Sequence, residues 1–104
     1  MAVALSETLL EDVKLALRLG SAAYDAEVSM LIDAACEDMC RVGVDEAYIA
    51  EAGPRVRHAV ICYCKASFGY DNAEAARFGD SYRQIVIDML HSGHNTAAQA
   101  GDGE

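Results

Sequence analysis

The stretch KASFGYDNAEAARFGDSYRQIVIDML, residues 65–90, decides the fold class of this chain. Its apolar side chains recur at i, i+3, i+4, i+7 and i+8, which predicts one face of an amphipathic helix. These side chains are Ala75, Phe78, Tyr82, Ile85, Val86, Met89 and Leu90. Before them, Gly69 predicts the end of an earlier helix, and Asp71 and Asn72 are residues that cap a new one. The stretch contains no run of catalytic residues, so we interpret it as an architectural element.

The composition predicts one small all-α domain. The chain has 104 residues, of which 53% are hydrophobic and 24% charged, and it contains one Pro and no Trp. This length supports a single core, and we find no β-branched run with the alternation of a strand. After residue 93 the sequence is polar, contains Gly and has no periodicity. We therefore expect a single domain over residues 1–93 and a disordered tail over residues 94–104.

The net charge and the cysteines restrict the class of protein. With 17 acidic and 8 basic residues the chain carries a formal charge of −9, which argues against gripping DNA phosphates as its main task. The beginning of the chain lacks the basic region of a secretory leader, and no segment has the roughly 20 apolar residues of a membrane span. We expect the four cysteines to be reduced thiols in a cytosol-like compartment.

Periodicity and capping signals predict a small bundle of four main helices plus a short helical turn. The first helix is expected to begin at Thr8, which forms a capping box with Glu11, and to end at Gly20. The second is expected over residues 26–42 with Asp25 as its cap, and it ends at Gly43. Asp45 opens the short turn. The third runs from about residue 55 to residue 68 after Gly53 and Pro54, and the fourth lies in the stretch quoted above.

Some apolar residues fall outside the helix faces expected to form the core. The third helix is apolar over most of its circumference, and only His58 and Lys65 form a narrow polar strip, a pattern typical of a buried helix. A domain of this size surrounds few of its own helices, so we expect a partner subunit to cover part of the third or fourth helix. The second helix carries one large apolar residue on its polar face. The candidate oligomer interface consists of Met30, Ile61, Phe68, Ala76 and Ile87.

The cysteines and histidines of the sequence favour structural roles over catalysis or metal binding. Cys36 and Cys40 lie one helical turn apart, where cysteines pack as small hydrophobic residues. Cys62 and Cys64 point about 160° apart on a helix, so they cannot hold one ion. The histidines lack zinc-finger spacing, and we find neither a nucleophile elbow nor a phosphate-binding loop. We therefore expect no enzyme activity, no metal site and no cofactor.

The quoted stretch, followed by HSG, closely resembles the C-terminal half of the head–tail connector (head-completion, DNA-packaging-associated) proteins of long-tailed bacteriophages and prophages. The matching positions are Lys65, Ala66, Phe68, Gly69, Asp71, Asn72, Ala75 or Ala76, Arg77, Phe78, Ser81 and Tyr82. TLLEDVKLALRLG and DAEVSMLIDAACEDM resemble the opening of the same family, so the resemblance covers residues 8–93. Ser67 stands where the family pattern has Asn, and the tail from His94 has no counterpart.

The resemblance implies an α-helical adaptor that assembles as a homo-oligomeric ring beneath the portal, at the head–tail junction of the virion. By resemblance the ring follows the symmetry of the portal and is dodecameric, and before assembly the protein resides in the host cytoplasm. The ring would extend the channel through which the genome passes without specific binding, and it would offer a docking surface to the tail or to a stopper protein. An acidic channel wall would repel phosphate and so avoid adhesion to the DNA.

Two other interpretations remain open at the level of sequence. One is a generic cytosolic helical module for protein–protein interaction, without a virion role, in which the resemblance is only local. A gene position beside portal and capsid genes would favour the virion adaptor over this generic module. The other is a thiol or metal-binding regulator, which requires Cys36 and Cys40 to be exposed. Slow reaction of these thiols in the folded protein would exclude it.

Overall fold

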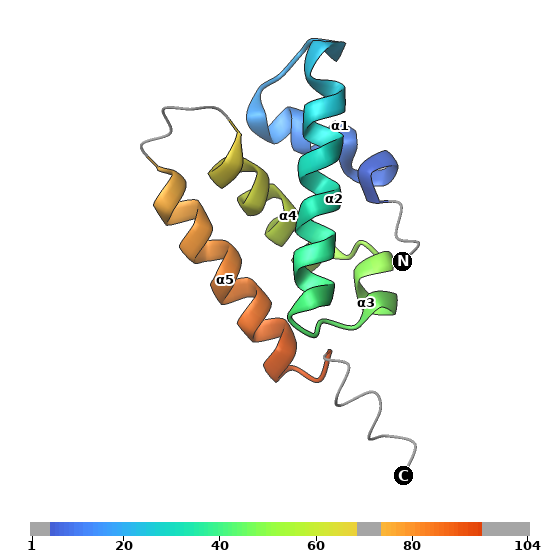
Figure 1. The fold of residues 1–104 in the computed structure, drawn as a ribbon, viewed down its shortest axis with the longest axis vertical. Helices are drawn as coiled ribbons and strands as arrows, with labels where there is room; N and C mark the ends of the chain where they lie inside the picture. Colours follow the sequence, from blue (N-terminus) through green and yellow to red (C-terminus); the bar gives the residue numbers. More distant parts are fainter. Residues whose placement is uncertain (1–4, 69–73, 95–104) are drawn as a thin grey trace.

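The computed structural model describes residues 5–68 and 74–94, and within these ranges it contains helices and no β-strand (Figure 1). The elements are α1 (Leu5–Leu17), the short 3₁₀ helix η1 (Ala22–Tyr24), α2 (Asp25–Arg41), α3 (Glu46–Ala50), α4 (Pro54–Ser67) and α5 (Ala75–His91). The all-α fold expected from the sequence is confirmed, with four main helices and one short helix, α3.

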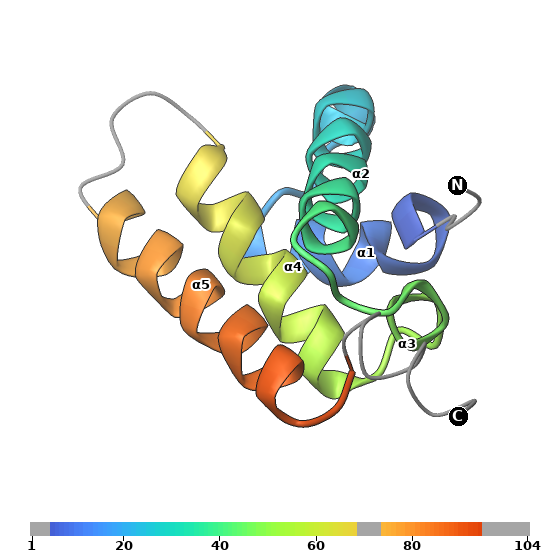
Figure 2. The same cartoon turned by 60° about the horizontal axis from the view of Figure 1, so that its bottom comes forward.

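Helix α4 is the centre of the arrangement. It packs against α5, α2 and α1, and α1 in turn packs against α2. Figure 2 shows α4 between α5 and α1, while α2 crosses over it and diverges from α5. The fold therefore places helices of the same chain around most of α4.

The core consists of residues that the helical periodicity selects, together with Cys62 and Cys64 of α4. These two cysteines lie off the stripe that periodicity predicts for this helix, which is Val56, Ala59, Val60, Tyr63 and Ser67. Val28, Ile32, Ala35 and Met39 of α2 are buried, as are Tyr82, Val86 and Met89 of α5. On α4, burial includes Val56, Ala59, Val60, Cys62 and Cys64. Much of the apolar surface of α4 that the sequence analysis assigned to a partner subunit is thus covered by α1, α2 and α5.

Several helix boundaries follow the expected signals. The Asp45 side chain accepts a hydrogen bond from the Tyr48 amide at 3.2 Å and so caps α3. Pro54 occupies the first turn of α4, where a missing amide hydrogen costs nothing. Gly43 follows α2 with a positive φ of 111°, and the Val44 amide donates to the Met39 carbonyl at 2.9 Å. This is the pattern by which a glycine ends a helix.

Other boundaries differ from the prediction. Helix α1 begins at Leu5, so Thr8 lies inside the helix and is not its cap. It ends at Leu17 because Arg18, at φ 62°, adopts the left-handed conformation two residues before Gly20. Asp25 is the first residue of α2 and not its cap; the Lys14 ammonium on α1 contacts its carboxylate at 2.7 Å, and the N-cap position belongs to Tyr24.

The corner expected between α4 and α5 and most of the expected tail, residues 95–104, lie outside the described residues. Gly69, Asp71 and Asn72 lie outside the described residues, and the N-cap position of α5 belongs to Glu74, which makes no capping hydrogen bond with its side chain. His94, the first residue of the expected tail, stacks on Tyr48 with 3.7 Å between ring centroids, and its carbonyl accepts a hydrogen bond from the Asp45 amide. Among the described helices, none is long and apolar enough to cross a membrane.

Candidate functional site

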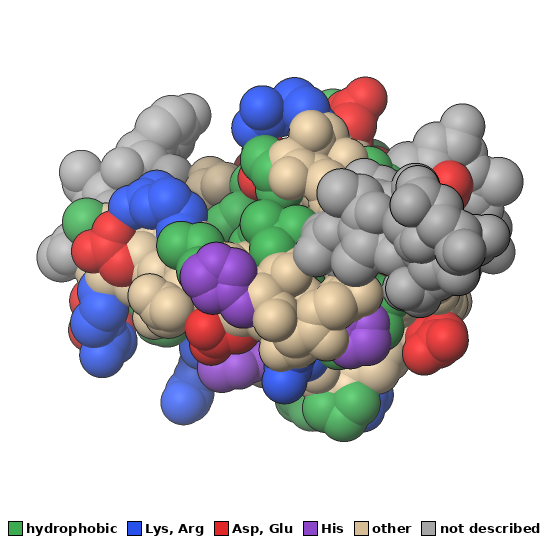
Figure 3. All heavy atoms as spheres, turned by 90° about the horizontal axis from the view of Figure 1, so that it is seen from below, with side chains coloured by type: hydrophobic (Ala, Val, Ile, Leu, Met, Phe, Trp, Pro, Cys, Tyr) green, Lys and Arg blue, Asp and Glu red, His purple; other side chains and the backbone are tan. Residues whose placement is uncertain are grey.

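A groove opens where α2 and α5 diverge over α4. Its volume is about 530 Å³, and the apolar side chains lining it are Val42, Tyr63, Ala66, Val86, Ile87 and Leu90. Figure 3 shows hydrophobic side chains gathered in the middle of this face of the molecule, with charged and histidine side chains around them. Val42, the C-cap residue of α2, has 40% of its surface exposed and contributes to the groove, although the apolar stripe of this helix predicts it on the core side. We call this surface the α2–α5 groove.

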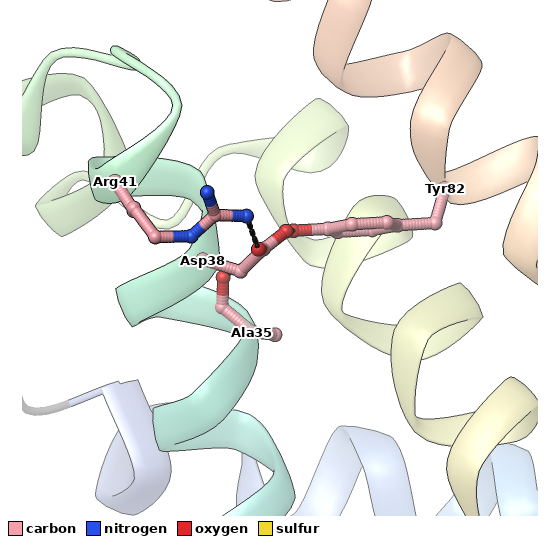
Figure 4. Close-up of polar contacts among 4 residues, drawn as sticks. All are labelled: Ala35, Asp38, Arg41 and Tyr82. Atoms are coloured by element: carbon pink, nitrogen blue, oxygen red, sulfur yellow. Dashed lines mark hydrogen bonds and ion pairs between the residues drawn. The ribbon is translucent and has the colours of Figure 1, made fainter.

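Polar contacts tie α2 to α5 across the groove (Figure 4). The Tyr82 hydroxyl on α5 donates a hydrogen bond to the Asp38 carboxylate on α2 at 2.7 Å, and it lies 3.5 Å from the Ala35 carbonyl. The Arg41 guanidinium donates to the other oxygen of Asp38 at 2.6 Å. The Tyr82 ring also meets the Tyr63 ring edge to face, with centroids 5.1 Å apart. The tie holds two helices that otherwise diverge.

The protonation of this cluster follows from its contacts. Burial acts to raise the pKa of Asp38, but the hydrogen bonds from Arg41 and Tyr82 outweigh it, so the pKa lies below its ordinary value. Burial, and then the hydrogen bond to Asp38, raise the pKa of Tyr82. Asp38 is therefore the charged acceptor and Tyr82 the protonated donor near neutral pH, which is the stronger type of hydrogen bond.

A second hollow lies where α1 meets α4, and we call it the Leu15 patch. It is lined by Asp12, Leu15, Pro54, Arg57, His58 and Ile61. Leu15 is 79% exposed, which is the largest fraction among the exposed large hydrophobic residues described. The Arg57 guanidinium lies 3.2 Å from the Asp12 carboxylate and joins the two helices beside Leu15.

The two surfaces lie on opposite sides of α4. Tyr63 and Ala66 face the groove, whereas His58 and Ile61 face the Leu15 patch. With 3.6 residues per turn, the two sets point in nearly opposite directions around the helix axis. The molecule therefore offers two different partly apolar surfaces on two of its sides.

The structure distributes the five candidate interface residues over several surfaces. Ile87 is 43% exposed in the groove, and Ile61 is half-buried in the Leu15 patch. Met30 is 65% exposed on the outer side of α2, as expected for a residue on its polar face, and Ala76 is exposed on α5. Phe68 is half-buried at the end of α4 and packs edge to face on Tyr24. These residues do not form one continuous patch.

Leu15 and the Asp38–Tyr82 contact were not among the residues singled out from the sequence. Leu15 could have been found by the argument that selected Met30, because it too lies off the apolar face of its helix. The contact between Asp38 and Tyr82 joins residues 44 positions apart. Neither helical pattern alone contains a signal that pairs them.

The cysteine thiols lie mainly inside the core. Cys36, Cys62 and Cys64 are buried, and Cys40 is half-buried. Burial raises the pKa of Cys36 and of Cys64 to about 12. Among the described residues, no group of three or more His, Cys, Asp or Glu side chains is placed to hold a metal ion. The exposure that a thiol or metal regulator requires of Cys36 is absent from this fold.

Comparison with known proteins gives the family. The model of a family described as phage connector protein matches residues 9–96, which include all of α2 to α5 and most of α1. No curated protein and no solved structure matches the chain. Because the family match extends over far more than half of its residues, this chain belongs to the phage connector proteins, a structural family of head–tail connectors whose members assemble with other phage virion proteins.

Proposed function

We propose that this protein is a head–tail adaptor that forms a homo-oligomeric ring beneath the portal of a phage or prophage particle. The observation that carries the proposal is the pair of partly apolar surfaces on opposite sides of α4. A ring of identical subunits needs two different complementary surfaces on each copy, whereas a two-fold dimer uses the same surface twice. The α2–α5 groove and the Leu15 patch are our candidates for these two surfaces, with Ile87 in one and Ile61 in the other.

The ring would extend the portal channel and offer a docking surface to the tail or to a stopper protein. We expect its subunit number to follow the portal, which gives a dodecamer. The exposed acids Glu27, Asp33 and Glu37 on the outer side of α2 are the candidates for an acidic channel wall. Such a wall would repel phosphate while the genome passes. Their replacement by Gln and Asn should slow DNA passage in assembled particles, and unchanged ejection rates would contradict this part of the proposal.

The ring is tested by native mass spectrometry of the purified protein over a range of concentrations, alone and mixed with the portal protein encoded by the same phage or prophage. The expected result is a closed multimer of one stoichiometry, either free or on the portal. A protein that remains monomeric or dimeric under both conditions would contradict the ring. It would then favour the alternative of a helical interaction module without this role.

A further inference from the structure

We propose that the α2–α5 groove receives the Leu15 patch of a second copy of this chain, so that successive copies join head to tail. This assignment rests on the proposed ring and names the contact that builds it. The groove would be one half of the subunit interface, and the exposed side of α1 around Leu15 would be the other half.

The apolar parts of the two surfaces match in kind. Leu15 on α1 has 79% of its surface exposed, and the groove exposes Val42 and Ile87 beside apolar residues of α4, Tyr63 and Ala66. Insertion of Leu15 would remove from water the most exposed large hydrophobic side chain among the described residues. Burial of a leucine side chain in this way contributes favourably to association.

The groove presents arginines that can meet the acids of the entering helix α1, and within the Leu15 patch Arg57 is already paired with Asp12. Two arginines and one acid line the groove, namely Arg41, Arg83 and Asp38, on a chain whose net charge is −9. The entering helix carries the exposed Glu11 one turn before Leu15. Arg41 is held by the partly buried Asp38, whereas Arg83 pairs with Asp80 in an exposed ion pair of the type that contributes little to stability. A guanidinium has five donors and can bind a second carboxylate. The groove is therefore suited to an acidic helix that carries a leucine.

The positions of the surfaces favour a chain of copies over a closed pair. The groove and the Leu15 patch lie on opposite sides of α4, so a copy whose groove is filled still presents its own Leu15 to the next copy. Repetition of such a contact produces a ring when the rotation between copies closes.

Two single variants and their mixture test the contact. Leu15→Asp blocks the Leu15 patch and leaves the groove intact, whereas Ile87→Asp blocks the groove and leaves the Leu15 patch intact. Both residues are exposed in the monomer, so circular dichroism should show that both variants retain the helical fold. Ala50→Asp, at an exposed position on α3 outside both surfaces, is the matched control. Sedimentation and native mass spectrometry report the assembly of each sample.

We expect the multimer to persist in the Ala50→Asp variant and to be lost in each of the other two. An equimolar mixture of Leu15→Asp and Ile87→Asp should form a heterodimer with one copy of each and nothing larger, because only one intact contact can form between them. A multimer that survives either substitution would overturn the assignment while leaving the ring in place. The assignment would also be overturned if the two variants are monomeric and do not form a heterodimer when mixed at concentrations well above those at which the wild-type multimer forms. A wild-type protein that forms no multimer, alone or on the portal, would instead contradict the ring itself.

Discussion

The two sides of α2 differ in how they meet their neighbours. Toward α1, the space is filled by buried side chains such as Leu9, Val13 and Val28, and the ion pair between Lys14 and Asp25 lies at the end of this contact. Toward α5, the hydrogen bond between Tyr82 and Asp38 spans an open groove. Each side has one polar interaction between helices, the Lys14–Asp25 ion pair or the Tyr82–Asp38 hydrogen bond. A polar interaction therefore does not decide which side is closed. The difference lies in the apolar side chains, which fill the interface between α2 and α1 and leave a groove between α2 and α5.

The largest difference between the two sides should appear when an isoleucine is shortened on each. Ile32→Ala removes a fully buried side chain of α2 and should lower the free energy of unfolding by about 2–5 kcal/mol, because the side chain loses its burial and leaves a cavity. Ile87→Ala in the exposed groove should change it by no more than about 0.5 kcal/mol in the monomer. Urea denaturation followed by circular dichroism measures both. Equal losses would show that the groove is part of the closed core.

The next largest effect should come from the tie across the groove. Tyr82→Phe removes the hydroxyl that donates to the Asp38 carboxylate, and a hydrogen bond to a charged group contributes about 1.5–3 kcal/mol. The matched control is Tyr63→Phe, because the Tyr63 ring lines the same groove and packs on Tyr82. We expect the control to lose clearly less stability in the same denaturation experiment. A Tyr82→Phe variant as stable as the wild type would show that packing alone holds α5 to α2.

The fold class and most of the core were available from the sequence because helical periodicity is a local property. The stripe from Phe78 to Leu90 became the inner face of α5, and Asp45 and Pro54 began the helices that they predicted. The prediction that the first helix begins at Thr8 was wrong, because a capping box shows only that these residues are compatible with a helix start. Nothing in that motif excludes a helix that begins one turn earlier, at Leu5.

The candidate site was harder to predict from the sequence than the fold class, because the site depends on how the helices are arranged in space. Ile61 and Ile87 both looked like surplus apolar residues, but the sequence could not show that they lie on opposite sides of α4. Cys62 also lies off the expected stripe, yet in the fold it is buried. The groove itself results from the divergence of α2 and α5, and no periodic pattern within either helix encodes that divergence (Figure 2).

A smaller effect is expected from acid pH, and it again concerns the open side. Because its folded-state pKa is lowered, Asp38 stabilises the fold above its unfolded pKa of about 4, and this contribution disappears as the pH falls through the lower, folded-state value. The stability difference between the wild type and Asp38→Asn should therefore shrink below about pH 4. Asp33→Asn, at an exposed acid on the same helix, is the control and should cost less stability at neutral pH. A difference for Asp38→Asn that stays constant down to the acid limit would argue against the charge of Asp38 as the acceptor.

The smallest perturbation is a thiol reagent, which compares the buried core with its margin without a substitution. Cys36, Cys62 and Cys64 are buried, and burial raises the pKa of each of these thiols, so few thiolates are available for reaction near pH 8. Cys40 is half-buried, although burial and nearby acids, Glu46 foremost, raise its pKa as well. We expect one slow modification of the native protein, located at Cys40 by peptide mass spectrometry, and three more when denaturant is added. The Cys40→Ser variant should then lose only the native-state reaction. Rapid modification of Cys36 in the native state would mean that the closed side opens readily, and it would revive the thiol regulator that the buried core otherwise argues against.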